Sequence, residues 1–279
     1  MRGSTGLDRA VQFRRWVTGL LLLGSALTVL VVGGRWGLLF VAVVVVCTAQ
    51  WELARLLGVH RDRVRTGLCM LQSACLPAVT LWAGGVGLLG AVVGALLTWM
   101  AVETLARGDL AGAQRELAFR MLCILYGGVL PCFFVLLWRI SDGVQWILWT
   151  ILVTAAGDTA AYYAGSLWGK RKLLPRVSPG KTVEGALAGL VGNGVSGLLY
   201  GLLFFQPVAT LEGFLLALVV GALGQVGDLS ESMLKREAGV KDSGWLLPGH
   251  GGVLDRLDSL LFSAPLVFFW ASGEALVTG

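Results

Sequence analysis

The stretch WGLLFVAVVVVCTAQWELA, residues 36–54, decides the fold class of this 279-residue chain. Its length matches the roughly 20 apolar residues that a helix needs to cross a bilayer core of about 30 Å. A strand of a transmembrane barrel alternates apolar and polar side chains, whereas residues 41–46 (VAVVVV) do not alternate. The stretch therefore predicts a helix that spans a membrane.

Apolar runs of the same kind recur along the whole chain, which is 56% hydrophobic and 14% charged and has a mean hydropathy of +0.77. A soluble domain carries about 25% charged residues. We therefore expect an all-α, polytopic bundle of about nine spans. The expected spans are residues 16–33, 36–54, 67–83, 86–104, 121–138, 145–165, 185–205, 211–229 and 259–274.

The basic residues predict the orientation of these spans, because Lys and Arg concentrate on the cytoplasmic side. Of the 22 Lys and Arg residues, all but Arg35 and Arg139 fall in the N-terminal segment or in alternate connectors. This pattern predicts a multi-pass membrane protein, with its N-terminus in the cytoplasm, its C-terminus outside and its polar site facing the cytoplasm. Topology alone accounts for much of this basicity, and we find no nucleic-acid motif. The basic connectors are residues 55–66, 105–120, 166–184 and 230–258.

The densest polar segment is residues 227–258, GDLSESMLKREAGVKDSGWLLPGHGGVLDRLD. Charge at the edge of a bilayer is costly, so this density indicates a site for charged substrates. Asp255 and Asp258 are three residues apart and share one helical face, and Asp228 precedes them at the end of another expected span. Such carboxylates suit Mg²⁺ that is shared with substrate phosphates. A preference of acids for helix N-termini, worth about 0.3–1 kcal/mol, is the alternative, but it leaves the neighbouring Arg256 unexplained.

A second polar group begins at Asp158, about two turns inside an expected span, with Tyr162 four residues later on the same face. The alternative role for Asp158 is a hydrogen bond between packed helices. Thr182 is expected to cap the next helix, whose N-terminal amides then attract phosphate, and Lys181 adds a mobile positive charge. The Gly-Lys-Thr sequence is not read as a P-loop, because the upstream glycine is missing and no strand is expected before it.

The third polar element is His250 followed by Gly251 and Gly252. A single His is more often structural than functional. Glycines on both sides, however, allow the backbone to approach a ligand closely. We therefore expect this segment to shape a binding pocket.

From Ser232 to Asp258 the chain resembles the phosphatidate cytidylyltransferases, also called CDP-diacylglycerol synthases. It matches the family signature of Ser, Lys-Arg, Lys-Asp, His-Gly-Gly and Asp-Arg-hydrophobe-Asp. Residues 158–165 and 178–185 are also similar to the family, although Gly180 stands where a second Lys is common, which weakens a paired-lysine phosphate clamp. In the N-terminal half the resemblance is carried by hydropathy and by Trp51-Glu52-Leu53.

The resemblance implies an enzyme that converts CTP and phosphatidate into CDP-diacylglycerol and pyrophosphate in phospholipid biosynthesis. It implies Mg²⁺, room for a second cation (K⁺ or Mg²⁺), contact with membrane lipids, and a homodimer; no nucleic acid is expected as a partner. It also implies a location in the bacterial inner (plasma) membrane, with residues 1–140 as a scaffold for lipid and dimer contacts and 141–279 as the catalytic region. The catalytic and metal-binding residues expected on this basis are Asp228, Asp255 and Asp258 for the metal, with Lys235, Arg236 and Arg256 to neutralise the triphosphate and pyrophosphate. The substrate-binding residues expected are Asp158, Tyr162, Ser178, Lys181, Thr182, Glu184, Ser232, Lys241, Asp242, His250, Gly251 and Gly252.

Two other classes of protein remain alternatives. A CTP-dependent lipid kinase shares the membrane setting and the nucleotide but transfers the γ-phosphoryl group. The second alternative is a transporter that couples ions through Asp158. Such a transporter requires polar residues and helix breaks at mid-membrane. In this chain the polar residues gather on one side of the membrane, which disfavours the transporter.

Overall fold

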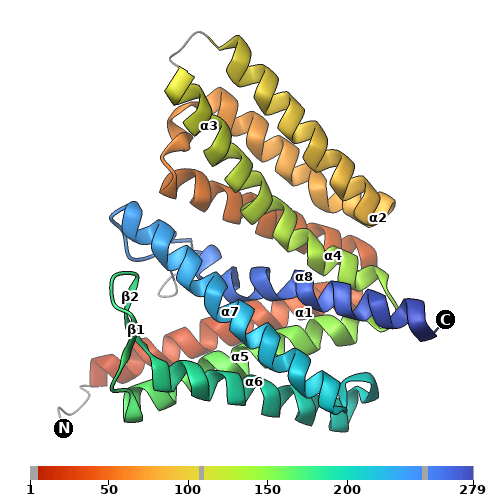
Figure 1. Cartoon of the computed structure of the whole chain (residues 1–279), viewed down its shortest axis with the longest axis vertical. Helices are drawn as coiled ribbons and strands as arrows, with labels where there is room; N and C mark the ends of the chain where they lie inside the picture. The colour runs from red at the N-terminus through yellow and green to blue at the C-terminus, as the bar shows by residue number, and fades with distance from the viewer. Residues whose placement is uncertain (1–5, 107–109, 247–250, 279) are drawn as a thin grey trace.

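The computed structural model describes residues 6–106, 110–246 and 251–278 and is helical over most of them (Figure 1). This confirms the all-α prediction at the level of fold class. His250 lies outside the described residues. The helices are α1 (Gly6–Leu56), α2 (Arg63–Leu105), α3 (Leu110–Leu122), α4 (Leu130–Arg139), α5 (Gly143–Trp168), α6 (Val183–Phe204), α7 (Leu211–Glu237) and α8 (Leu254–Thr278), with a π-helix (Cys123–Val129) and two 3-10 turns (Val59–Arg61 and Gln206–Val208).

Both α1 and α2 are broken in the middle by a glycine with a positive φ, Gly34 at 51° and Gly84 at 64°. L-residues rarely adopt this conformation, and glycine does so readily. Figure 1 shows the orange and yellow halves of α2 as two rods joined at a sharp turn. The ring centroids of Trp36 and Trp82 are 5.9 Å apart, so both breaks lie at the same end of the molecule. These breaks fall between the spans that the sequence predicts at 33/36 and 83/86.

Five helical segments among the described residues are long and apolar enough to cross a membrane. This agrees with the predicted membrane protein, and the count of nine spans stays a prediction. The five segments are Val32–Leu56, Arg63–Leu105, Leu110–Arg139, Val183–Phe204 and Leu211–Glu237.

A small antiparallel sheet departs from the all-helical expectation. Strand β1 (Lys172–Leu174) pairs with β2 (Ser178–Thr182), with Lys172 opposite Thr182. Strands this short show no alternating pattern long enough to predict them. Because β2 leads directly into α6, the expectation that no strand precedes Lys181 is wrong. The missing upstream glycine still separates this segment from a P-loop, since Pro175 occupies that position.

Helix α8 lies between two apolar cores. Its first half contributes Leu254 and Leu261 to a core shared with α1, α2 and the π-helix. Its second half contributes Ala264, Val267 and Ala271 to a core shared with α5, α6 and α7. Helix α8 as a whole is therefore held by packing against both halves of the chain.

Close packing of small residues joins α5, α6 and α7. Asn193 of α6 is buried, and its side-chain amide donates to the carbonyl of Val153 at 2.9 Å. A Cβ atom at Gly157 or Gly221 would overlap the Asn193 side chain. Membrane helices associate in this way, through small residues and interhelical hydrogen bonds.

Replacing Gly157 by Leu is expected to lower thermal stability, because the new side chain displaces Asn193 from its hydrogen bond. Overpacking of this kind costs about 1–3 kcal/mol. Thermal unfolding of the purified protein in detergent measures the effect. Gly90→Leu is the matched control, because Gly90 is exposed and has open space beside it; an equal loss of stability in both variants would contradict the packing role.

Candidate active site

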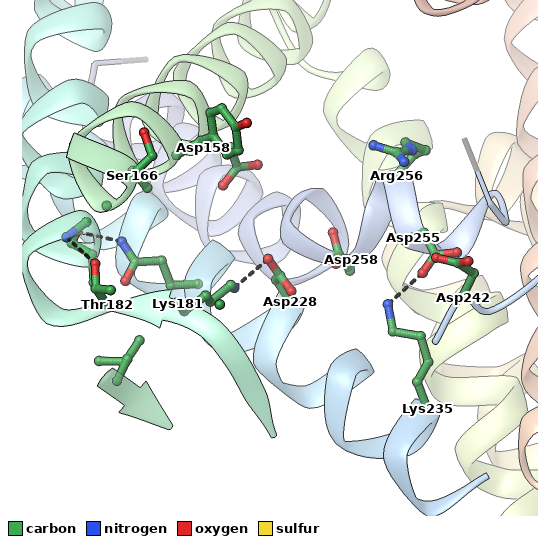
Figure 2. A pocket seen from close by; sticks show the side chains of 18 residues that line it. Asp158, Ser166, Lys181, Thr182, Asp228, Lys235, Asp242, Asp255, Arg256 and Asp258 are labelled. Atoms are coloured by element: carbon green, nitrogen blue, oxygen red, sulfur yellow. Dashed lines mark hydrogen bonds and ion pairs between the residues drawn. The ribbon is translucent and has the colours of Figure 1, made fainter. Parts of the chain in front are cut away.

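A cavity of about 630 Å³ opens between α5, β2, α6, α7 and the start of α8 (Figure 2). Its size lies within the range of small-molecule sites, about 300–1,000 Å³. Most of the polar residues that line it are residues that the sequence singles out. They are Asp158, Tyr162, Lys181, Thr182, Asp228, Lys235, Asp242, Asp255, Arg256 and Asp258.

The carboxylates of Asp228 and Asp258 lie beside each other at the centre of this cavity, with Asp158 facing them from α5 (Figure 2). Asp258 is 9% exposed, and its Oδ1 accepts from the Ser259 N–H at 2.7 Å. Burial and the neighbouring Asp228 carboxylate together raise the pKa of Asp258, which precedes the apolar part of α8. Two carboxylates placed side by side in this way favour a cation near them.

Lysine 181 of β2 supplies positive charge to this centre. Lys181 Nζ lies 2.5 Å from Asp228 Oδ2, and both side chains are 29% exposed. The next residue, Thr182, caps α6 as expected, because its Oγ1 accepts from the Gly185 N–H at 3.1 Å. Strand β2 thus places the Lys181 side chain and the N-terminus of α6 at one wall of the cavity.

Asp255 has different surroundings from Asp258, although the two share a helical face. Its Oδ1 is 2.6 Å from Lys235 Nζ, and its Oδ2 accepts from the N–H groups of Ser243 (2.9 Å) and Gly252 (2.8 Å). Burial alone raises the pKa of Asp255, but the hydrogen bonds from Lys235 and from the Gly252 and Ser243 N–H groups outweigh it and lower the pKa. Asp255 is therefore ionised at neutral pH and holds the loop that precedes α8.

Lys235 is held between two carboxylates. Its Nζ lies 2.5 Å from Glu231 Oε2 in addition to its contact with Asp255, and Glu231 is fully buried. The spacing of Glu231 places it on one helical face with Asp228, Ser232 and Lys235, an oxygen-rich cluster suited to Mg²⁺, but Glu231 was not among the predicted site residues. Lys235 thus lines the cavity, but its positive charge is already paired with Glu231 and Asp255.

Other predicted residues hold the loops around the cavity. Arg236 donates to the carbonyls of Val177 (3.2 Å) and Val240 (3.1 Å), which ties the end of α7 to the β-hairpin. Glu184 accepts from the backbone N–H groups of Lys170 and Arg171 at the base of the same hairpin. Among the described residues, the predicted ones that are not part of the cavity lining are Ser178, Glu184, Ser232, Arg236, Lys241, Gly251 and Gly252.

One buried residue near the site comes from the predicted scaffold. Glu52 of α1 is 4% exposed, and its carboxylate accepts from the N–H groups of Val253 and Leu254 at the start of α8. The sequence signal was an acid at the end of an apolar run, which does not reveal its partner. The division into residues 1–140 and 141–279 stays a prediction, although this contact crosses it.

The acids of the cavity are the candidates for the predicted Mg²⁺ site. Within the described parts of the chain, no group of three or more His, Cys, Asp and Glu side chains is arranged to hold a metal ion. Mg²⁺, however, is commonly held by one or two carboxylates together with substrate phosphates. Asp228 and Asp258 provide such a pair. Asp228 also contacts Lys181, and Asp255 contacts Lys235 and the loop, so a role for Asp255 as a third ligand stays a prediction. The residues fit a metal that the substrates help to bind.

Comparison with known proteins identifies relatives of this chain. The model of the Cytidylyltransferase family matches residues 13–272. A phosphatidate cytidylyltransferase of Pseudomonas aeruginosa is 37% identical over 275 residues, which cover 93% of this chain and 97% of that protein. One of Synechocystis sp. is 40% identical over 183 residues, and an uncharacterized protein YnbB of Escherichia coli is 45% identical over 132 residues. This chain spans 62% and 44% of the lengths of those two relatives.

Long apolar helices arranged around a charged cavity are typical of a helical membrane protein. Within that class, the chain belongs to the Cytidylyltransferase family.

Replacing Lys235 by Ala is expected to destabilise the fold strongly, because Glu231 and Asp255 then lose the cation that compensates their buried charge. Breaking a buried ion pair from one side costs about 3–5 kcal/mol. Lys181→Ala breaks a more exposed pair, worth about 0–1 kcal/mol, and serves as the matched control. Thermal unfolding in detergent is the measurement, and equal stability of the two variants would refute the assignment of Lys235 as a buried structural cation.

Proposed function

We propose that this protein is a phosphatidate cytidylyltransferase, a nucleotidyltransferase of phospholipid biosynthesis. It transfers the cytidylyl group of CTP to phosphatidate, which gives CDP-diacylglycerol and pyrophosphate. The observation that carries the proposal is the cavity in which a chain of the Cytidylyltransferase family gathers Lys181 and Arg256 with Asp228 and Asp258. The relative that this chain covers almost completely bears that enzyme name.

The reaction brings two polyanions together. A phosphate oxygen of phosphatidate forms a bond to the α-phosphorus of CTP, and the bond from that phosphorus to the bridging oxygen of the β-phosphate breaks, so that pyrophosphate leaves. The attacking oxygen is already anionic, so no general base is needed. Catalysis of this kind depends on positioning and on neutralising charge.

The lining residues have distinct tasks in this scheme. Lys181 and Arg256 contact phosphate oxygens, and the α6 N-terminus capped by Thr182 faces the same anions. Asp228 and Asp258 would hold Mg²⁺, which stabilises negative charge on the phosphates when bound. A second cation, K⁺ or Mg²⁺, is part of the proposal. Lys235 and Asp255 keep the wall between α7 and α8 in place.

The membrane arrangement proposed with this function has nine spans. With the breaks at Gly34 and Gly84, the described helices form nine successive rods, if the run from α3 to α4 is taken as one. Trp36, Trp82 and Arg139 mark the end away from the cavity, since Arg139 donates to the Leu81 carbonyl beside Gly84. We propose that the cavity end faces the cytoplasm of a bacterial cell, that the N-terminus lies inside and the C-terminus outside, and that the protein is a homodimer.

An assay with labelled CTP, phosphatidate and Mg²⁺ tests the proposal. We expect pyrophosphate and a CDP-lipid, with a chelator abolishing turnover. Formation of CDP and a newly phosphorylated lipid would instead indicate a CTP-dependent lipid kinase.

Asp228→Asn and Asp258→Asn are each expected to lower kcat by about 100-fold or more, since each removes a charge that would bind the metal. Both substitutions keep the shape of the side chain. Glu212→Gln, at the opposite end of α7, is the control and is expected to keep wild-type activity. Near wild-type turnover in either Asp variant would remove that residue from the proposed metal site.

A further inference from the structure

The carboxylate of Glu52 is an unusual feature of α1, because it is buried and its hydrogen-bond partners lie about 200 positions later in the chain. Oε1 accepts from the Val253 N–H at 2.9 Å, and Oε2 accepts from the Leu254 N–H at 2.8 Å. The Ser243 hydroxyl is 2.9 Å from Oε2. A buried charge persists when it is fully hydrogen-bonded in this way.

These partners place Glu52 at the N-terminus of α8. The N–H groups in the first turn of a helix have no partner within the helix and need one from outside. A carboxylate at this position also interacts favourably with the helix dipole. Glu52 of α1 therefore caps α8 from another part of the chain, whereas Thr182 and Thr210 cap α6 and α7 from the residue just before the helix.

Ser243 links this cap to the cavity. Its hydroxyl lies 2.9 Å from Glu52 Oε2 and also 2.9 Å from Asp255 Oδ2, and its N–H donates to the same Asp255 oxygen. Asp258 follows Asp255 by one turn of α8. A movement of the Glu52 carboxylate therefore changes the position of both acids.

Two glycines of the loop have no side chain and so leave room for the Glu52 carboxylate. A Cβ atom at Gly244 or at Gly252 would overlap the Glu52 carboxylate. Both glycines belong to the polar segment 227–258 that the sequence singles out. The loop before α8 is thus shaped around a side chain of α1.

We infer that Glu52 is a positioning residue for the reaction, which fixes the start of α8 and thereby the direction in which Asp255 and Asp258 face the cavity. The expected effect of Glu52 on turnover rests on the proposed function. Glu52 acts through Ser243 and the N–H groups of α8, and it does not itself need to contact the substrates.

Glu52→Gln tests the inference, because one carboxylate oxygen becomes an amide group that can no longer accept from an N–H. We expect kcat to fall about tenfold or more while the KM for CTP changes less than about threefold, as for a loss of positioning in the transition state. We also expect trypsin to cleave after Lys241, which is exposed in the same loop, about tenfold faster, because the loop opens locally.

Glu103→Gln is the matched control. Glu103 is 5% exposed, lies in the N-terminal half, and pairs with Arg65 away from the loop. We expect this variant to keep the wild-type kcat and the wild-type rate of cleavage after Lys241. Equal changes in both variants, or a folded Glu52→Gln protein with unchanged cleavage or unchanged kcat, would overturn the inference.

Ser243→Ala tests the same inference if the Glu52→Gln variant does not fold. It removes only the hydroxyl that joins Glu52 to Asp255 and leaves the cap on Val253 and Leu254 in place. We expect faster cleavage after Lys241 and a lower kcat, and wild-type values for both would overturn the inference. The cleavage measurement uses no substrate and is therefore independent of the proposed function. If the wild-type protein shows no cytidylyl transfer, the proposed function is refuted, and the cleavage rates still report whether Glu52 holds the loop.

Discussion

The charge balance between α7 and α8 is the constraint on which the site depends. Lys235 lies between Glu231 and Asp255 in a region where neither carboxylate is well hydrated. Each ion is tolerated because the others are present. This arrangement fixes the two helices relative to each other, and so places Asp228 of α7 next to Asp258 of α8. The reactive region is therefore built on buried electrostatics rather than on apolar packing alone.

The division of labour among the acids follows from their surroundings. Asp255 is saturated by one cation and two backbone N–H groups, whereas Asp258 lies against another carboxylate. Two acids one helical turn apart thus acquire different electrostatic properties. A residue pattern that treats them as equivalent ligands describes their spacing but not their chemistry.

Much of the fold and part of the site could be predicted from the sequence. The apolar runs, the breaks near Gly34 and Gly84 and the cap at Thr182 depend on local sequence, and the structure has them where they were predicted. The pairing of Glu52 with the start of α8 could not be predicted, because it joins residues about 200 positions apart. The β-hairpin was missed because its strands are too short to show a period.

The reversals inside α1 and α2 have a consequence for how this protein enters its membrane. Each reversal is made at one glycine, and Arg35 is the only charged residue adjacent to either glycine in the sequence, while Arg139 lies against Gly84 in the structure. A helical pair of this kind exposes little polar backbone at its tip, which lowers the free energy of moving that backbone into lipid, while Arg35 adds the cost of one charge to the first pair. Each pair is therefore suited to entering a bilayer as one unit.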